Sequence, residues 1–337
     1  MIDLLVAGGG PAGLATAILG ARAGLEVVVV ERRHGPVDKA CGEGLMPHAL
    51  TMLRTLGVEA PGKPFHGITY IDGQRRVTGR FHGGAGRGVR RTALHAGLLE
   101  AATAAGVRIE HAEIGPVNQS ATSVHCSGFQ ARYLAAADGL HSPIRAALGL
   151  ARPSGGARRW GIRRHHVITP WSDCVEVYWS DDAEAYVTPV ADDCVGVAIL
   201  TSRKGGFDAH LGAFPALEER VCGHAHGPDR AAGPLRQKVI NRTAGRVLLV
   251  GDAAGYVDAL TGEGLGIAFG AAKLLVECVA AGRPQDYDRR WRRMSRRYRL
   301  LTAAVLQATA SPLRSRIVPA AAQFPGAFTR LVNLLAE

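Results

Sequence analysis

The spacing of apolar residues at the start of the chain predicts a strand, a turn, a helix and a second strand. Residues 2–7 are almost all apolar and suit a buried strand, and residues 8–13 form a glycine-rich turn. An apolar helical stretch follows, and residues 27–30 are four consecutive valines, which is typical of a strand buried on both faces of a parallel sheet. Glu31 stands at the end of this second strand. The pattern therefore predicts a β–α–β unit that ends in an acidic residue.

Glycines at three positions of the turn give this unit a specific chemistry. Gly8 permits the tight turn, Gly10 lets the backbone approach a pyrophosphate, and Gly13 lets the helix pack close to the strand. The free N–H groups at the start of the helix can then bind phosphates. Glu31 lies 18 residues beyond Gly13, where it can accept hydrogen bonds from ribose hydroxyls. The sequence predicts dinucleotide binding, and the two arginines after Glu31 leave NADP, with its 2′-phosphate, open as an alternative.

A hairpin, a loop and a helix are predicted next. Residues 65–81 alternate between apolar and polar positions around the turn signal Asp72-Gly73, which favours two short strands. Residues 83–88 are rich in glycine, and no buried strand leads into them, so we expect a connecting loop. Arg91 opens an amphipathic helix with its leucines on one face.

Two later strands are each followed directly by an adjacent glycine and aspartate. A meander over residues 113–136 ends in an apolar strand that leads into Asp138-Gly139. Residues 245–250 form another buried strand, which leads into Gly251-Asp252. A glycine-rich stretch over residues 262–266 and a long helix follow, and the remainder of the chain is predicted to be helical.

Residues 158–200 have a different character from the parts on either side. They contain three strand-like segments separated by Asp-Asp turns, which indicates an inserted β-sheet. Because side chains alternate along a strand, Tyr186 and Thr188 share one face. We expect that face to line a substrate pocket, with a packed sheet core as the alternative.

Composition and cysteine usage indicate a protein with a sizeable core. The chain has 337 residues, 47% of them hydrophobic, which is enough for one large or two intermeshed domains. We expect no signal peptide and no membrane span, because the start lacks a basic region and no apolar run is long enough. The six cysteines show no paired spacing, so we expect a cytoplasmic protein.

The net charge of +11 is concentrated near the C-terminal end. From residue 289 onward there are ten arginines and a single acid, so the preceding part carries only +2. A nucleic-acid enzyme would spread its basic residues along a binding face, so we expect no nucleic-acid partner. Seven arginines fall between Arg289 and Arg299, and a solvated helix that pairs with acids elsewhere explains them. Contact with an anionic membrane surface, an acidic carrier protein or a diphosphate substrate stays open.

Three motifs now coincide in order: the N-terminal glycine turn, Asp138-Gly139 and Gly251-Asp252. This combination resembles the FAD-dependent enzymes of the para-hydroxybenzoate hydroxylase fold, which include aromatic-ring monooxygenases, geranylgeranyl reductases and flavin-dependent halogenases. The resemblance covers roughly residues 1–285. It implies an α/β fold: a Rossmann-like FAD-binding domain, an inserted antiparallel β-sheet substrate domain and a helical C-terminus.

The resemblance also implies domain boundaries. The FAD-binding domain would comprise residues 1–66, 88–150 and 236–285. The β-sheet substrate domain would comprise residues 67–87 and 151–235. Residues 286–337 would form the basic helical C-terminal segment.

The resemblance implies a set of cofactor contacts. The glycine turn would hold the FAD pyrophosphate, Glu31 the adenosine ribose, and Asp252 the ribityl chain or an adjacent phosphate. The stretch over residues 262–266 would pass beneath the flavin, with its N–H groups at a helix start near the ring. The full set is Gly8, Gly10, Pro11, Ala12, Gly13, Glu31, Arg32, Arg91, Asp138, Gly251, Asp252, Gly262, Gly264, Leu265 and Gly266.

The subfamily and the reaction are less sharply indicated. We expect an NAD(P)H-dependent monooxygenase that uses O₂ on an apolar or aromatic small molecule, with His48, Tyr186, Thr188 and Pro189 lining the substrate pocket. The loop that begins Cys41-Gly42-Glu43-Gly44 looks like that of geranylgeranyl reductases, which reduce carbon–carbon double bonds. In that alternative Cys41 or a water supplies a proton. A non-catalytic dinucleotide-binding module is a third possibility. No metal site is expected, because the cluster over residues 222–226 has no partner pair.

Overall fold

A computed structural model describes residues 1–155 and 158–336 of the chain. Its first sheet has a parallel centre with the order β20-β11-β1-β2-β8, so the two strands that precede glycine–aspartate motifs lie together beside the N-terminal strand. The antiparallel strands β19, β9 and β10 extend it. The predicted β–α–β unit is confirmed. These strands are β1 (Ile2–Ala7), β2 (Val27–Val30), β8 (Arg108–Glu110), β9 (Asn118–Gln119), β10 (Val124–Cys126), β11 (Phe129–Ala136), β19 (Thr243–Ala244) and β20 (Val247–Leu249).

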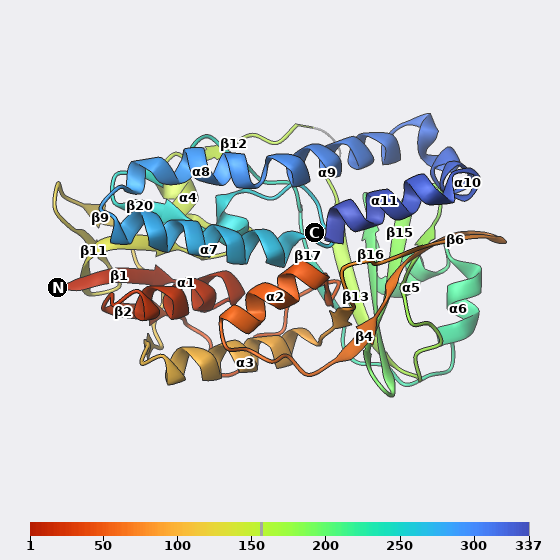
Figure 1. The fold of residues 1–337 in the computed structure, drawn as a ribbon, viewed down its shortest axis with the longest axis horizontal. Helices are drawn as coiled ribbons and strands as arrows, with labels where there is room; N and C mark the ends of the chain where they lie inside the picture. Colours follow the sequence, from red (N-terminus) through yellow and green to blue (C-terminus); the bar gives the residue numbers. More distant parts are fainter. Residues whose placement is uncertain (156–157, 337) are drawn as a thin grey trace.

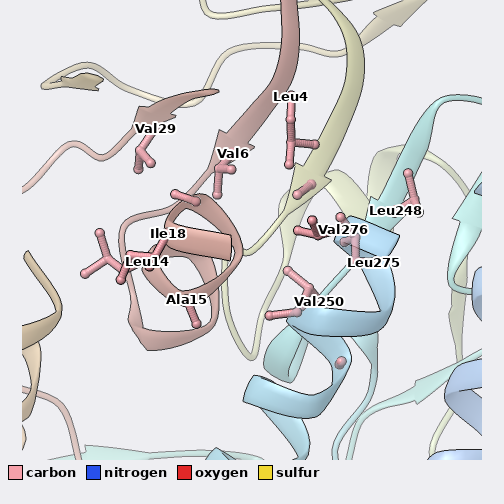
Figure 2. Close-up of a cluster of buried hydrophobic side chains, with 14 of the residues drawn as sticks. Leu4, Val6, Leu14, Ala15, Ile18, Val29, Leu248, Val250, Leu275 and Val276 are labelled. Atoms are coloured by element: carbon pink, nitrogen blue, oxygen red, sulfur yellow. The ribbon is translucent and has the colours of Figure 1, made fainter. Parts of the chain in front are cut away.

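Helices α1 and α7 pack side by side against this sheet. Figure 2 shows Leu14 and Ile18 of α1 and Leu275 of α7 gathered around Val6 of β1 and Leu248 of β20, and all five are fully buried. Helix α3 packs on α1, and α2 packs on α7. The core therefore fixes the position of the loops at the carboxyl ends of the strands, where ligands of such sheets bind. The helices are α1 (Pro11–Arg22), α2 (Pro47–Thr55), α3 (Arg91–Ala104) and α7 (Gly264–Ala280).

The inserted sheet has seven strands in the order β17-β13-β16-β15-β14-β5-β6. It is antiparallel, as expected, except between β14 and β5, which pair in parallel. One face packs on α5 and α6 through a separate hydrophobic core. The strands are β5 (Gly67–Asp72), β6 (Arg75–Arg80), β13 (Trp160–Val167), β14 (Val175–Trp179), β15 (Ala183–Ala191), β16 (Cys194–Thr201) and β17 (Arg230–Ala232), and the helices are α5 (Phe207–Leu211) and α6 (Pro215–Val221).

Small sheets connect the two larger ones. A three-stranded sheet pairs β3 (Gly44–Leu45) and β4 (Lys63–Phe65) with β7 (Gly86–Gly88). The expectation of a loop over residues 83–88 is therefore wrong for the last three residues. These residues form a strand because they pair with β3 and β4, and not because they bury apolar side chains. A two-stranded sheet joins β12 (Ala151–Arg152) to β18 (Lys238–Val239).

The C-terminal helices run along the molecule from the first sheet to the inserted one (Figure 1). The arginine-rich run forms two helices rather than one, α8 (Tyr287–Met294) and α9 (Arg296–Thr309), separated by the buried Ser295. Helices α10 (Ile317–Gln323) and α11 (Pro325–Ala336) then pack on β6 and close the second face of the inserted sheet.

Candidate active site

The glycine turn after β1 is shaped by close packing at two positions and by open space at a third. Gly8 has a φ of +110°, and a Cβ there would lie 2.5 Å from the carbonyl oxygen of Ala137. A Cβ at Gly13 would lie 1.9 Å from the carbonyl oxygen of Gly8. A Cβ at Gly10 would meet no heavy atom within 4 Å. Gly8 and Gly13 therefore hold the turn against the sheet, while Gly10 leaves the start of α1 open to a phosphate.

Glu31 faces the glycine turn from the end of β2. Its Oε2 accepts a hydrogen bond of 2.9 Å from the N–H of Gly9, and its Oε1 accepts one of 3.0 Å from the N–H of Arg33. The side chain of Arg33 also lies beside it, with Nε 3.7 Å from Oε1. Arg32, which the resemblance implies at the cofactor, pairs with Glu113 at the surface at 3.7 Å.

His95 is hydrogen-bonded to the glycine turn, and it was not among the site residues expected from the sequence. Its Nδ1 accepts a hydrogen bond of 3.4 Å from the N–H of Val37, so its Nε2 carries the proton that it donates to the carbonyl of Gly9 at 2.7 Å. Burial lowers the pKa of this imidazole, which keeps it neutral. The available sequence signal was its place one helical turn after Arg91 on α3.

Arg91 and Asp138 each hold a buried polar atom without a hydrogen-bond partner among the described residues. These atoms are NH1 of Arg91 and Oδ1 of Asp138. The other oxygen of Asp138 accepts a hydrogen bond of 3.0 Å from the N–H of Ile144. Burial raises the pKa of the Asp138 carboxyl. Because a buried polar group without a partner is costly, the two atoms indicate a place where a polar ligand completes the site.

Many protein atoms lie around the carboxylate of Asp252, although the residue is exposed to solvent on one side. Burial raises its pKa, and the nearby charges of Lys39, Arg91 and Arg145 oppose that change. Asp252 stands in η1 (Gly251–Ala254), directly after β20. The motif after β20 therefore faces the same space as the start of α3, as the resemblance implies.

Arg145 ties together the loops after β11 and β20. It lies in α4 (Pro143–Ala147) and is buried. Its NH1 donates to the carbonyls of Asp252 at 3.3 Å and Ala253 at 3.1 Å, and its NH2 donates to the carbonyl of Leu140 at 2.8 Å. The guanidinium therefore fixes the distance between the two aspartate motifs. Its NH2 also donates to Oε1 of Gln237 at 2.8 Å. Sequence reasoning gave Arg145 no role, because most of these partners are backbone carbonyls.

Glu43, in the loop before α2, is the centre of a buried network between the two sheets. It has a φ of +59° and is almost fully buried. Its Oε1 accepts a hydrogen bond of 2.8 Å from the N–H of Arg91, and its Oε2 accepts one of 2.6 Å from Nε2 of His165. Arg163 donates to Nδ1 of His165 at 2.9 Å and also pairs with Asp38. This network fastens the loop around Cys41 to the inserted sheet.

The thiol of Cys41 is held in its protonated form. Burial raises its pKa, and the charge of Glu43 raises it further, while Arg91 acts in the opposite direction. The N–H of Glu43 donates to Sγ at 3.4 Å. A nucleophilic cysteine needs a lowered pKa, so this protonated thiol is not suited to attack as a thiolate.

His48, in α2, contacts the start of α7. Its Nε2 lies 3.0 Å from Oε2 of Glu263, and its Nδ1 lies 3.1 Å from the carbonyl of Ala336. A Cβ at Gly266 would lie 2.1 Å from Nε2 of His48, so Gly266 makes room for this imidazole. Gly262, Gly264 and Leu265 remain exposed or partly exposed at the helix N-terminus, where N–H groups lack intrahelical partners.

Tyr186 and Thr188 reach from the inserted sheet to the loops of the first sheet. The hydroxyl of Tyr186 donates to the carbonyl of Leu260 at 2.9 Å, and that of Thr188 donates to the carbonyl of Gly42 at 2.8 Å. Both therefore lie on the face that alternation predicted to be shared. Pro189 is buried and lies against Gly88, where an added Cβ would come within 1.8 Å of the proline carbonyl.

In residues 1–155 and 158–336, no group of three or more histidine, cysteine, aspartate or glutamate side chains is arranged to hold a metal ion. No helix in the same part of the chain is long and apolar enough to cross a membrane.

Comparison with known proteins places this site among flavoproteins. A family model described as "FAD binding domain" matches residues 1–220. The chain is 27% identical to a menaquinone reductase of Mycolicibacterium smegmatis, over 86% of this chain and 79% of that protein. It is 26% identical to an aurachin C monooxygenase/isomerase of Stigmatella aurantiaca, over 83% of this chain and 81% of that protein.

A reductase relative and a solved structure extend the comparison. A digeranylgeranylglycerophospholipid reductase of Methanothermobacter thermautotrophicus is 27% identical, over 89% of this chain and 82% of that protein. The solved structure of a flavin-dependent brominase superposes with a TM-score of 0.85 at 15% identity, covering 99% of this chain and 93% of that one. The brominase shows that the whole chain shares the fold of these flavoproteins.

Proposed function

The chain belongs to the FAD binding domain family, and from this premise we propose that it is an NAD(P)H-dependent monooxygenase of apolar, aromatic or quinone-like small molecules. Membership of the family and its similarity to a menaquinone reductase and a monooxygenase make it an FAD-dependent oxidoreductase. The electron donor, the reaction with O₂ and the substrate class are the proposed parts.

Three observations show that the residues present suit FAD. Gly10 leaves open space at the start of α1, where the pyrophosphate would be held. Arg91 and Asp138 have buried atoms without a partner among the described residues, and Asp252, which lies near Arg91, is accessible to solvent. When bound, FAD accepts electrons from a donor and, once reduced, passes them to O₂ or to a double bond.

The observation that carries the monooxygenase proposal is that the polar groups between the two sheets are already engaged. Tyr186 and Thr188 donate to backbone carbonyls, and His48 and His165 are each bonded to a glutamate. These groups therefore position the loops, and the bonds of Tyr186, Thr188 and His165 join the two sheets, which would exclude water from the space between them. Oxygen transfer with a reduced flavin requires such exclusion more than it requires a side-chain acid or base.

The names of the relatives support an apolar, quinone-like substrate. One is a menaquinone reductase and another acts on aurachin C, according to their names. We therefore propose a ring compound of low polarity, with a menaquinone as the test compound.

The experiment uses FAD-loaded protein, NADPH and a menaquinone, with and without O₂, followed by mass spectrometry of the product. A monooxygenase yields a product that contains one oxygen atom from ¹⁸O₂ and gives no product without O₂. A product that gains two hydrogens in the absence of O₂ would contradict the proposal.

The second candidate is a carbon–carbon double-bond reductase, and the state of Cys41 favours it. Its raised pKa keeps a proton on the thiol, next to the loop that resembles that of geranylgeranyl reductases. In this reaction a hydride is delivered to one carbon and a proton to the other, and the thiol would provide the proton. The Cys41→Ala variant distinguishes the two: it should lower turnover of a reductase by about 100-fold or more and leave oxygenation nearly unchanged.

A further inference from the structure

A cavity of about 610 Å³ lies beside the loop that contains Asp252 and is covered by α8 and α9. Its walls come from the segment around β18, from α7 and from the two arginine-rich helices. Figure 1 shows α8 and α9 along the upper edge of the molecule, with β12 beside them. Apart from Asp252, the charged residues that line it are basic. They are Arg152, Arg236, Lys238, Arg242, Arg292, Arg296 and Arg299.

Two of these seven cations share one carboxylate. Arg242 and Arg292 both bind the carboxylate of Asp288, at 2.9 Å and 2.5 Å. Burial and the neighbouring arginines lower the pKa of Arg242 to about 10, although Asp288 opposes this. Its Nε is buried without a hydrogen-bond partner in the described part of the chain. The innermost cation of the cavity is therefore incompletely satisfied.

The other five cations have no carboxylate partner among residues 1–155 and 158–336. They are Arg152, Arg236, Lys238, Arg296 and Arg299. Holding like charges together is unfavourable unless an anion binds between them. This distribution also revises the expectation for the whole run from Arg289 to Arg299. Arg289 and Arg290 pair with Asp286 and Glu277, whereas Arg296 and Arg299 line the cavity.

Apolar and uncharged polar residues complete the lining of the cavity, and exposed aliphatic side chains belong to it or follow it in the sequence. Ile267, Ala268 and Ala271 of α7 form part of the wall. Leu300, which lines the cavity, is 61% exposed, and Ile240, which follows the lining residue Val239, is 55% exposed. A basic cluster with exposed aliphatic residues beside it is typical of a protein surface that docks on a bilayer, and a purely soluble polyphosphate would leave those residues unexplained.

We propose that this cavity binds the phosphate headgroup of an anionic phospholipid and docks the enzyme on a membrane surface. The five unpaired cations bind the phosphate, and Leu300 and Ile240 enter the region between headgroups and acyl chains. Gly251, Asp252 and Gly264, which the resemblance assigns to FAD, also line this cavity, whereas none of its basic residues belongs to that set. The inference does not depend on the proposed reaction.

The test is co-sedimentation of the FAD-loaded protein with vesicles of phosphatidylcholine alone or with about 30% phosphatidylglycerol. We expect binding to the anionic vesicles, weaker binding to the neutral ones, and a loss of binding as salt is raised. The Lys238→Gln/Arg296→Gln variant removes two cavity charges and should bind about 25-fold more weakly, from about fivefold per charge near a membrane surface. Unchanged FAD absorbance and melting temperature establish that the variant is folded.

The matched control is Arg289→Gln/Arg293→Gln, which removes the same charge from α8 at positions that do not line the cavity. It should bind anionic vesicles nearly as well as the wild type. Equal weakening of both variants would show a general charge effect and overturn the cavity as the site. No binding to vesicles, with inorganic pyrophosphate raising the melting temperature of the wild type but not of Lys238→Gln/Arg296→Gln, would overturn the lipid in favour of a soluble phosphate. No response to either probe would overturn the site altogether.

Discussion

Individual residues hold this site in place through bonds that cross between distant parts of the chain. Glu43 joins the start of α3 to His165 of β13, and Arg145 joins two loops through their carbonyls. The glycine turn and both aspartate motifs could be located from the sequence, since their function depends on local spacing. Arg145 and His165 could not, because each acts on a partner far away in the chain and no local pattern marks it. His95 is marked only by its place one helical turn after Arg91.

Replacing Glu43 should show how much the buried network contributes. Glu43→Gln removes the charge that faces Arg163 and places an NH2 donor where either the N–H of Arg91 or Nε2 of His165 needs an acceptor. We expect a loss of about 2–4 kcal/mol in the free energy of unfolding, measured by denaturant titration, because a buried charged group loses its partner. Glu113→Gln, which breaks the exposed pair with Arg32, should have no measurable effect. Equal stability of both variants would contradict the network's role.

At the scale of elements, the start of α7 is held between α2 and the C-terminal helix α11. His48 of α2 bonds both Glu263 and the carbonyl of Ala336, and Gly266 leaves room for the imidazole. The helices and most strands were predictable, since continuous apolar runs and amphipathic spacing define them. The strand at β7 and the break at Ser295 were not, because pairing with other segments and packing determine them.

The contact of His48 makes the stability of this junction depend on pH. Burial lowers the pKa of His48, but the hydrogen bond and charge of Glu263 and the carbonyl of Ala336 raise it by more. Because folding raises this pKa, the stabilisation is complete below about pH 6.5 and is lost as pH rises through the folded-state value. The melting temperature should therefore fall between about pH 6 and 8. His48→Gln should flatten that dependence, and an unchanged slope would refute this assignment.

At the scale of the whole molecule, the C-terminal segment joins the two sheets. Arg314, after α9, pairs with Glu184 of β15, which also pairs with Arg159. Helices α10 and α11 then cover the inserted sheet beside Tyr70, Tyr186 and Trp179. The α/β fold with an inserted sheet was predicted from the motifs and confirmed. The way the last helices seal the sheet was not predictable, because it depends on the shape of both surfaces.

Binding of FAD by the Gly10→Val variant tests the central claim most directly. A side chain at this position enters open space, so the protein should fold with a melting temperature close to that of the wild type. The same side chain would occupy the place of the pyrophosphate, so the affinity for FAD, measured by fluorescence titration of the apoprotein, should fall by about 100-fold or more. A folded Gly10→Val protein that binds FAD as tightly as the wild type would contradict the assignment of the glycine turn, and with it the account of the site.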